Sequence, residues 1–291
     1  MQVLDGKQTS LDIQQEIAQE VQVLLDEGKK KPHLAAILVG NNGASETYVG
    51  AKVKACERVG FDSTLLCFDE SITEDELVAE VNKINKDANI DGLIVQLPLP
   101  SHINEMTITE TILPSKDVDG FHPQNIGKMA LNLTTFLPAT PAGIVELIKR
   151  YNIDTEGKHC VVVGRSHIVG SPMSILMARN SYPGNCTVTL THSRTTNLKE
   201  LCLTADILIV ALGRAEFITA DMVKDGACVI DVGISRVKSD KTKSGWKLKG
   251  DVNYDEVFPK CDFITPVPGG VGPMTIAMLL KNTLYAVKGF N

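Results

Sequence analysis

The sequence predicts an α/β fold that is divided into two domains. Its 291 residues are enough to bury two hydrophobic cores. Short apolar runs alternate with helical patterns along the chain, which is typical of βα units on a largely parallel sheet. A glycine-containing turn at Gly164 joins one of the later apolar runs to a helical pattern. These features indicate two successive sets of βα units.

The first half of the chain supplies the strands and helices of the first domain. The runs LAAILV and GLIVQL are continuously apolar, as expected for parallel strands that are covered on both faces. A loop rich in Pro, Asp and Gly follows at 113–125. Strands are expected near 34–39, 64–68 and 92–97, and helices near 10–28, 44–59, 74–87 and 103–112.

The second half begins with a helix at 141–151 and continues as a second set of strands. The lysine-rich stretch 236–250 is expected to be a solvated excursion between strands. The last helix, near 273–288, is expected to return to the first domain. The predicted domains are therefore 1–140, completed by 273–291, and 141–272. The expected strands are 159–163, 186–190, 206–211, 227–231 and 262–264.

Composition excludes several classes of protein. A net charge of −6 argues against a general binder of nucleic acid or anionic membranes. No apolar run approaches the ~20 residues that span a bilayer, and the N-terminus lacks a signal pattern, so the cytosol is expected. The 7 cysteines are scattered, which indicates reduced thiols rather than a disulfide framework or a metal site.

A lysine lies on the apolar side of the helix expected at 44–59. Wound at roughly 100° per residue, this segment has one apolar arc with Lys52 in its middle. Tyr48 lies one turn earlier on the same face. Burial disfavours the charged amine, so this Tyr-x-x-x-Lys pair indicates acid–base chemistry. The alternative is a lysine whose stem covers apolar surface while its amine stays in water.

The clearest cofactor signal is HCVVVGRSHIVGSP at 159–172. An apolar strand ends at Gly164, and Gly170 and Pro172 open a helix, so backbone N–H groups can meet a pyrophosphate. The spacing Gly-x-Ser-x-x-x-Gly departs from the usual Gly-x-Gly-x-x-Gly fingerprint. The surrounding βα units favour a Rossmann-like dinucleotide-binding turn, and an ordinary βα turn is the alternative.

The end of the next strand indicates which dinucleotide binds. NAD-selective sites usually carry a carboxylate there for the ribose 2′-hydroxyl. This chain has His192, Ser193 and Arg194 instead, with Arg165 in the first turn. Such donors and cations suit a 2′-phosphate, so NADP is expected rather than NAD. The alternative is that Arg194 is a solvated loop charge.

Several other strand ends are candidate ligand positions, because open α/β sheets place their crevice there. Gly213 and Gly233 would let backbone approach a cofactor, and Ile234 is expected beside the nicotinamide. Gln96 ends a strand of the first domain, where its amide is expected to bond Lys52 or a bound ring.

Two loops complete the candidate set. Asp119 lies in KDVDGFHP, where a carboxylate usually just caps a turn. PVPGGVGPMT, at 266–275, is rigid at its prolines and permissive at its glycines, so it suits the lining of a flat ligand. An ordinary linker with a helix start at Pro273 is the alternative.

Together these motifs closely resemble the bifunctional methylenetetrahydrofolate dehydrogenase/methenyltetrahydrofolate cyclohydrolase family of one-carbon metabolism. The resemblance covers essentially the whole chain. It rests on six blocks in order: YVGAK (48–52), VQLPLP (95–100), KDVDGFHP (116–123), GRSHIVGSP (164–172), DVGI (231–234) and PVPGGVGPMT (266–275).

The resemblance implies NADP-dependent oxidation of 5,10-methylenetetrahydrofolate, followed by hydrolysis to 10-formyltetrahydrofolate. It also implies a homodimer joined through the cofactor domains and a folate site in a cleft between the two domains. The formate-activating third activity of some fused relatives is not expected. The family's active-site lysine falls on Lys52, its substrate-stacking tyrosine on Tyr48, its supporting glutamine on Gln96 and its pterin-binding aspartate on Asp119. Its NADP contacts fall on Gly164, Arg165, Ser166, Ser193 and Ile234, and one folate wall on Pro268, Gly269, Gly270 and Val271.

Two other functions stay open on the sequence. Short-chain dehydrogenases also use Tyr-x-x-x-Lys, but after the dinucleotide unit and in the same domain. Here the pair precedes Gly164 by more than a hundred residues. The second alternative function is a non-catalytic dinucleotide sensor that uses residues 141–270 as its binding module. This alternative does not explain why Lys52 lies on an apolar arc.

Overall fold

The computed structural model describes residues 1–40, 43–240, 242 and 245–290, and the chain forms two compact units. Unit 1 combines residues 1–9 with 140–275. Unit 2 combines residues 10–139 with 276–291.

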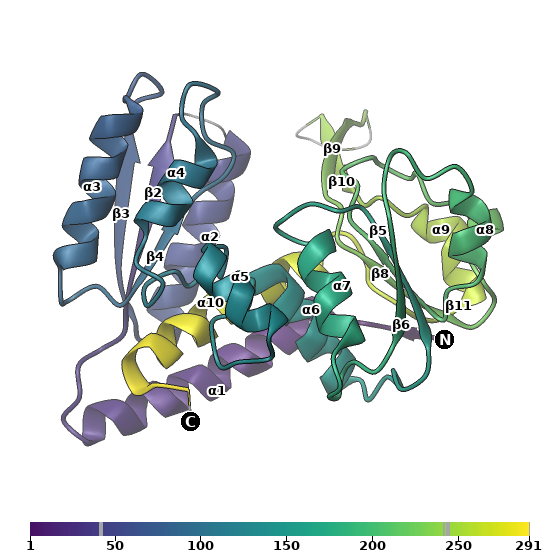
Figure 1. Cartoon of the computed structure of the whole chain (residues 1–291), viewed down its shortest axis with the longest axis horizontal. Coiled ribbons are helices and arrows are strands. Elements are labelled where there is room, and N and C mark those ends of the chain that lie inside the picture. The colour runs from purple at the N-terminus through teal and green to yellow at the C-terminus, as the bar shows by residue number, and fades with distance from the viewer. Residues whose placement is uncertain (41–42, 241, 243–244, 291) are drawn as a thin grey trace. The chain divides into compact units, whose positions relative to one another are not determined.

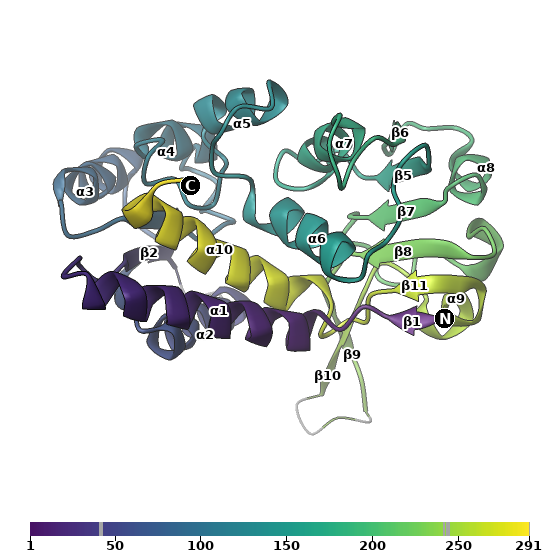
Figure 2. The same cartoon turned by 90° about the horizontal axis from the view of Figure 1, so that it is seen from below.

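Unit 1 is built on a six-stranded, entirely parallel sheet in the order β1-β11-β8-β7-β5-β6. Helices α6 and α7 cover one face of this sheet and α8 and α9 cover the other (Figure 2). Its central strands are runs of Val, Ile and Cys because both faces are covered. The bounds are β1 (Gln2–Val3), β5 (His159–Val163), β6 (Thr187–Thr191), β7 (Ile207–Val210), β8 (Ala227–Asp231), β11 (Cys261–Ile264), α6 (Ala139–Arg150), α7 (Gly170–Ala178), α8 (Leu198–Leu203) and α9 (Tyr254–Val257), with short 3₁₀ turns at Ala220–Met222 and Phe258–Lys260.

Strand β1 corrects the expected domain boundaries, which place residues 1–9 in the N-terminal domain. Its two residues pair in parallel with Phe263 and Ile264 of β11. Leu4 continues the ladder by donating its N–H to Ile264 O at 2.8 Å, and its side chain is fully buried. This edge strand pairs with a segment at the far end of the sequence, which no local pattern can reveal.

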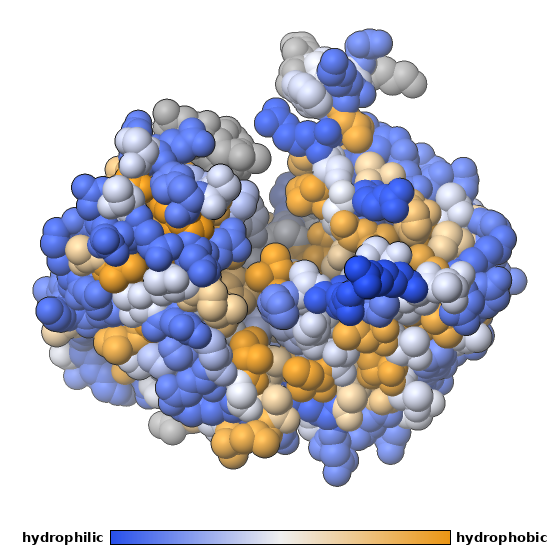
Figure 3. Space-filling view, turned by 45° about the horizontal axis from the view of Figure 1, so that its top comes forward, coloured by the Kyte–Doolittle hydropathy of each residue, from blue (hydrophilic) through white to orange (hydrophobic). Residues whose placement is uncertain are grey.

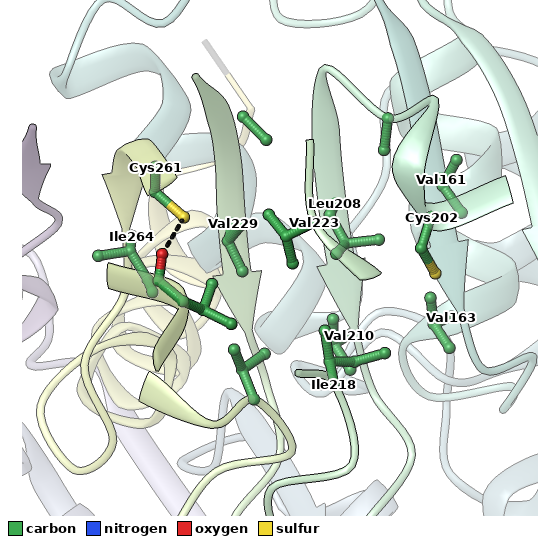
Figure 4. Close-up of a cluster of buried hydrophobic side chains, with 14 residues drawn as sticks. Val161, Val163, Cys202, Leu208, Val210, Ile218, Val223, Val229, Cys261 and Ile264 are labelled. Carbon is green, nitrogen blue, oxygen red and sulfur yellow. Dashed lines mark hydrogen bonds between the residues drawn. The ribbon is translucent and has the colours of Figure 1, made fainter. Parts of the chain in front are cut away.

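The core between the sheet of unit 1 and α8 is a single apolar cluster (Figure 4). Val161 and Val163 of β5 point into it together with Leu208 and Val210 of β7, because alternate residues of a strand share a face. Val229 of β8 completes the row. This packing fixes the spacing of three adjacent strands, and hence of the loops at their carboxyl ends.

Unit 2 has a three-stranded parallel sheet in the order β3-β2-β4 (Figure 1). Its central strand, β2, is buried from Leu34 onward. Helix α3 begins with a capping box, in which Thr73 and Glu76 each accept the other's backbone N–H. The bounds are α1 (Gly6–Asp26), β2 (His33–Val39), α2 (Gly43–Val59), β3 (Asp62–Phe68), α3 (Glu74–Lys86), β4 (Gly92–Val95), α4 (Glu105–Thr111), α5 (Pro123–Ala130) and α10 (Val271–Lys288).

Two segments differ from their sequence expectation. The Pro-, Asp- and Gly-rich loop at 113–125 runs into α5, which begins at Pro123 after His122 accepts the Gln124 N–H on its ring at 3.0 Å. The lysine-rich stretch 236–250 contains an antiparallel hairpin of β9 (Ser235–Lys238) and β10 (Trp246–Lys249). Cross-strand pairing orders the two strands β9 and β10, although half of their residues are Lys or Arg, and residues 241 and 243–244 between them lie outside the described residues.

The hydropathy of the surface and of the described helices bears on whether the chain could cross a membrane. Hydrophilic and hydrophobic residues are interspersed over the face that Figure 3 shows. Within the described ranges, no helix combines the length and the hydropathy needed to cross a bilayer.

Candidate active site and cofactor site

Each sheet has one point at which the chain changes the side on which it adds strands. In unit 2, β2 is followed by β3 on one side and then by β4 on the other; in unit 1, β5 is followed in the same way by β6 and β7. Ligands of open α/β sheets bind outside the carboxyl ends of the strands at such a point. Gln96 directly follows β4 and Gly164 directly follows β5. The two groups of predicted site residues therefore begin where the topology favours a ligand.

Lys52 lies on the buried face of α2, as its position on the apolar arc predicts. It is 5 % exposed, and Val49 and Cys56 beside it are 1 % exposed. Its Nζ donates to Oε1 of Gln96 at 3.1 Å and lies 4.9 Å from the centroid of the Tyr48 ring. The alternative of an amine that stays in water is wrong, because the stem and the amine are both enclosed.

Burial moves the two ionisable groups of this cluster towards their neutral forms. Desolvation lowers the pKa of Lys52, and the negative charge of Asp119 opposes this shift. Desolvation likewise raises the pKa of Asp119 to about 6, against the lowering effect of the Lys52 charge. A buried lysine with a lowered pKa beside an aspartate with a raised pKa is typical of acid–base chemistry.

Gln96 has its amide held at both ends, which fixes the direction of its oxygen. Its Nε2 donates to Leu97 O at 2.8 Å, and its backbone N–H donates to Ile37 O at 2.9 Å in continuation of the β4 ladder. Oε1 is therefore left to accept from Lys52. This bond is compatible with both the charged and the neutral amine, because each carries N–H donors.

The loop that carries Asp119 is organised by Asp117, which sequence reasoning missed. The Asp117 carboxylate accepts the backbone N–H groups of Gly120, Phe121 and His122 at 3.1, 3.2 and 2.8 Å. Nδ2 of Asn125 adds a fourth bond at 2.8 Å. An aspartate three residues before a glycine is a common turn signal, and it is the one local feature that points to this role.

Asp119 has its carboxylate available for a ligand. It is partly buried and lines a cavity of about 20 Å³ together with apolar residues such as Leu93 and Val95. No group in the part of the chain that the structure describes hydrogen-bonds its carboxylate oxygens. A carboxylate without a hydrogen-bond partner can accept N–H donors from a ligand.

The predicted dinucleotide turn has a backbone that only glycine permits. A Cβ on Gly164 would lie 2.2 Å from Ala211 O, and Gly164 has a φ of +111°. A Cβ on Gly170 would lie 1.9 Å from Gly164 O. Ser166 Oγ accepts the N–H groups of Val169 and Gly170 at 3.2 and 3.4 Å, which secures the start of α7.

This turn fits a dinucleotide phosphate. The backbone N–H groups of 165–168 donate to no other group within the described residues, and these four residues are exposed. Unpaired N–H groups before a helix start form a concavity for anions. The usual fingerprint places its second glycine where this chain has Ser166, whose hydroxyl instead caps the helix.

The turn after β6 carries the groups expected to recognise a 2′-phosphate. The ring Nδ1 of His192 accepts the backbone N–H of Arg194 at 3.2 Å. The backbone N–H of His192 donates to Thr195 Oγ1 at 3.0 Å. Ser193 and Arg194 are exposed. Among the described residues, neither Arg194 nor Arg165 forms an ion pair, so both guanidinium groups can take an anionic ligand.

The other predicted positions also lie at carboxyl ends of strands in unit 1. Gly213 follows β7 with a φ of +68° and open space beside its Cα. Ile234 follows β8 and is 62 % exposed. These two residues and the Gly164 turn thus belong to loops at one edge of the same sheet.

The loop after β11 is shorter than predicted, because the helix that follows it begins earlier. Pro268 is exposed and Gly269 has a φ of +110°. Gly270 lies so close to Gly6 that a Cβ on Gly6 would be 1.9 Å from its carbonyl oxygen. Helix α10 begins at Val271 rather than at 273, so Val271 is a buried first-turn residue rather than part of the loop.

Comparison with protein families gives two matches that together cover most of the chain. Residues 4–119 match the tetrahydrofolate dehydrogenase/cyclohydrolase catalytic domain. Residues 138–291 match the NAD(P)-binding domain of the same family. The chain is also 65 % identical over 286 residues to the bifunctional protein FolD of Cytophaga hutchinsonii, with 98 % of this chain and 99 % of that protein covered.

Solved structures agree with these matches. The bifunctional FolD enzyme of Campylobacter jejuni has a TM-score of 0.93 at 48 % identity, with 99 % of both chains covered. The methylenetetrahydrofolate dehydrogenase-cyclohydrolase of Trypanosoma brucei, complexed with NADP and an inhibitor, has a TM-score of 0.94 at 35 % identity. That alignment covers 99 % of this chain and 97 % of the other.

The close backbone approach at Gly164 can be tested by substitution. We expect Gly164→Ala to lower the free energy of unfolding by about 3 kcal/mol, because it combines a left-handed φ with a clash against Ala211 O. Gly157→Ala is the matched control, since Gly157 has a φ of +69° but open space beside it, and should cost about 1 kcal/mol. Urea unfolding of both variants measures the difference, and equal losses would contradict the close approach.

Proposed function

Because the chain belongs to the tetrahydrofolate dehydrogenase/cyclohydrolase family, we propose that it oxidises 5,10-methylenetetrahydrofolate with NADP and hydrolyses the product to 10-formyltetrahydrofolate. The observation that carries this proposal is the buried amine of Lys52, bonded to Gln96 and electrostatically coupled to Asp119. In this assignment unit 2 binds the folate and unit 1 binds NADP.

The oxidation step needs placement more than proton transfer. When bound, NADP accepts a hydride from the methylene carbon of the folate. The two nitrogens that flank this carbon donate electron density and leave a delocalised methenyl cation, so no proton has to be removed. The Tyr48 ring packs against the folate ring, and the Asp119 carboxylate accepts the N–H donors of the pterin.

The hydrolysis step needs a base. A water oxygen adds to the methenyl carbon and gives one proton to the base. The bond from this carbon to N5 then breaks while the remaining hydroxyl proton passes to N5, which leaves the formyl group on N10. We assign the proton to the neutral amine of Lys52, which Gln96 Oε1 holds in place. Desolvation lowers the pKa of Lys52, and this makes the neutral amine available at lower pH than in a free lysine.

The preference for NADP is assigned to the turn after β6. Ser193 and Arg194 supply a hydroxyl and a guanidinium where an NAD-selective site usually has a carboxylate. Arg165 adds a second exposed cation in the Gly164 turn. Ile234, exposed after β8, is assigned to the nicotinamide side.

We further propose a homodimer joined through the cofactor units. Strand β6 is the last strand of its sheet, and within the described ranges only β5 pairs with it. Such an edge is a template for pairing with a second copy, and Leu190 on it is 36 % exposed. Sedimentation velocity of the full chain tests this assembly.

A cytosolic location is proposed because all seven cysteines are free thiols.

Lys52→Met separates the two activities. We expect the cyclohydrolase rate to fall by about a hundredfold or more, because the base is lost, while hydride transfer stays measurable. Lys54→Met is the matched control, since Lys54 is exposed on the other side of α2. Parallel recording of NADPH and methenyl-folate absorbance gives both rates. Equal loss of both, with folate binding intact, would reduce Lys52 to a shared positioning role.

Asp119→Asn should change the pH dependence of ring opening. The rate rises with pH because the neutral amine is the active form, and the negative charge of Asp119 raises the pKa of Lys52. Its removal therefore moves the inflection to lower pH, and it also weakens folate binding. Rates at saturating folate, corrected for the uncatalysed reaction, are compared with those of Asp62→Asn, an exposed carboxylate of the same unit. An unmoved inflection would contradict the coupling.

Arg194→Gln tests the cofactor preference. We expect the KM for NADP to rise about tenfold through loss of one charge-assisted contact to the 2′-phosphate. The KM for NAD, which lacks this phosphate, should stay the same and serves as the internal control. A parallel change of both constants would assign Arg194 to general stability instead.

A further inference from the structure

A buried carboxylate holds the loop that follows β7. Asp251 is fully buried, and its carboxylate accepts the backbone N–H groups of Leu212, Gly213 and Arg214 at 2.5, 2.9 and 2.7 Å. Three successive N–H groups directed at one carboxylate fix both the position and the orientation of the loop. The side of Gly213 that would carry a Cβ faces open space.

Asp251 is itself held by a second buried carboxylate, Asp231. Oδ1 of Asp231 accepts the N–H groups of Gly233 and Asp251 at 3.0 Å each, and Oδ2 accepts that of Val252 at 2.9 Å. Burial raises the pKa of Asp231 to about 7, and the nearby Asp251 charge adds to this rise against the lowering effect of the N–H donors. Two buried carboxylates thus lie close together, and backbone N–H groups that donate to them stabilise each one.

Two glycines pack directly against this pair. A Cβ on Gly250 would lie 1.9 Å from Asp231 Oδ2, and a Cβ on Gly233 would lie 2.1 Å from Asp251 Cγ. The loop that the pair holds begins at Ala211, whose carbonyl oxygen contacts the Gly164 turn. The pair therefore supports the carboxyl edge of the sheet beside the ends of the neighbouring strands β5 and β7.

We propose that Asp251, secured by Asp231, is a positioning residue for NADP: it fixes the backbone of 212–214 beside the dinucleotide turn and acts on the cofactor only through that loop. This inference rests on the proposed function, because it takes NADP as the ligand of unit 1. Neither carboxylate has to touch the cofactor, since both are directed at backbone N–H groups of the protein.

The bifunctional enzyme supplies its own control for this proposal. Asp251→Asn removes the charge and places an N–H₂ group against backbone N–H donors, so the KM for NADP should rise about tenfold or more. Ring opening of methenyl-folate does not use NADP, and its kcat should stay within about twofold of the wild-type value. Calorimetric titration with NADP gives a readout that does not depend on activity.

Asp206→Asn is the matched variant. Asp206 lies at the amino end of β7, where its carboxylate accepts the His159 N–H at 2.9 Å and pairs with Lys224 at 2.6 Å. Its removal should lower stability without changing the KM for NADP. An unchanged NADP affinity in Asp251→Asn, or an equal loss in Asp206→Asn, overturns the proposal. Absence of ring opening in the wild-type enzyme would instead overturn the proposed function.

A measurement on the unaltered chain covers the case in which Asp251→Asn does not fold. Hydrogen exchange should show the amides of Leu212, Gly213 and Arg214 strongly protected, although Gly213 and Arg214 are exposed residues of a loop. NADP should increase this protection further. Exchange of these three amides at the rate of free loop amides would overturn the proposal.

Discussion

The hydrogen bond from Lys52 to Gln96 is the interaction on which the proposed chemistry of unit 2 depends. An amine enclosed by apolar side chains is stable only with a polar partner, and Gln96 provides one without adding a charge. A carboxylate at that position would keep the lysine protonated. The charge of Asp119 influences Lys52 without a direct bond between them. The amine is therefore anchored in space while its proton remains exchangeable.

In unit 1 the corresponding constraint is the close approach of backbone segments. The Gly164 turn contacts the end of β7. The buried carboxylates of Asp251 and Asp231 accept backbone N–H groups of the surrounding loops and so fix their positions. Backbone held in this way presents N–H donors to a ligand without intervening side chains. This arrangement suits a long ligand that carries phosphates. The side chains proposed to recognise the cofactor are few, and among them Arg194 lies in the turn after β6.

The sequence predicts those features of the fold and site that depend on local periodicity. The apolar arc of α2 is enough to place Lys52 among buried neighbours, and the Gly164 turn follows from a strand, a glycine and a helix start. Asp251 could not be found in this way, because its partners lie 37 to 39 residues earlier in the chain and are backbone groups of no particular residue type. Asp117 is an intermediate case, since its partners are local.

The free thiols have a practical consequence for spectroscopy. Six of the seven cysteines are buried, and burial raises the pKa of each of these six, for example that of Cys56 to about 12. Thiolates react and thiols do not, so an electrophilic dye has one accessible target, Cys67 on β3. The native chain can thus be tagged at a single defined point in unit 2 without engineering, which provides a fluorescent reporter for ligand titrations.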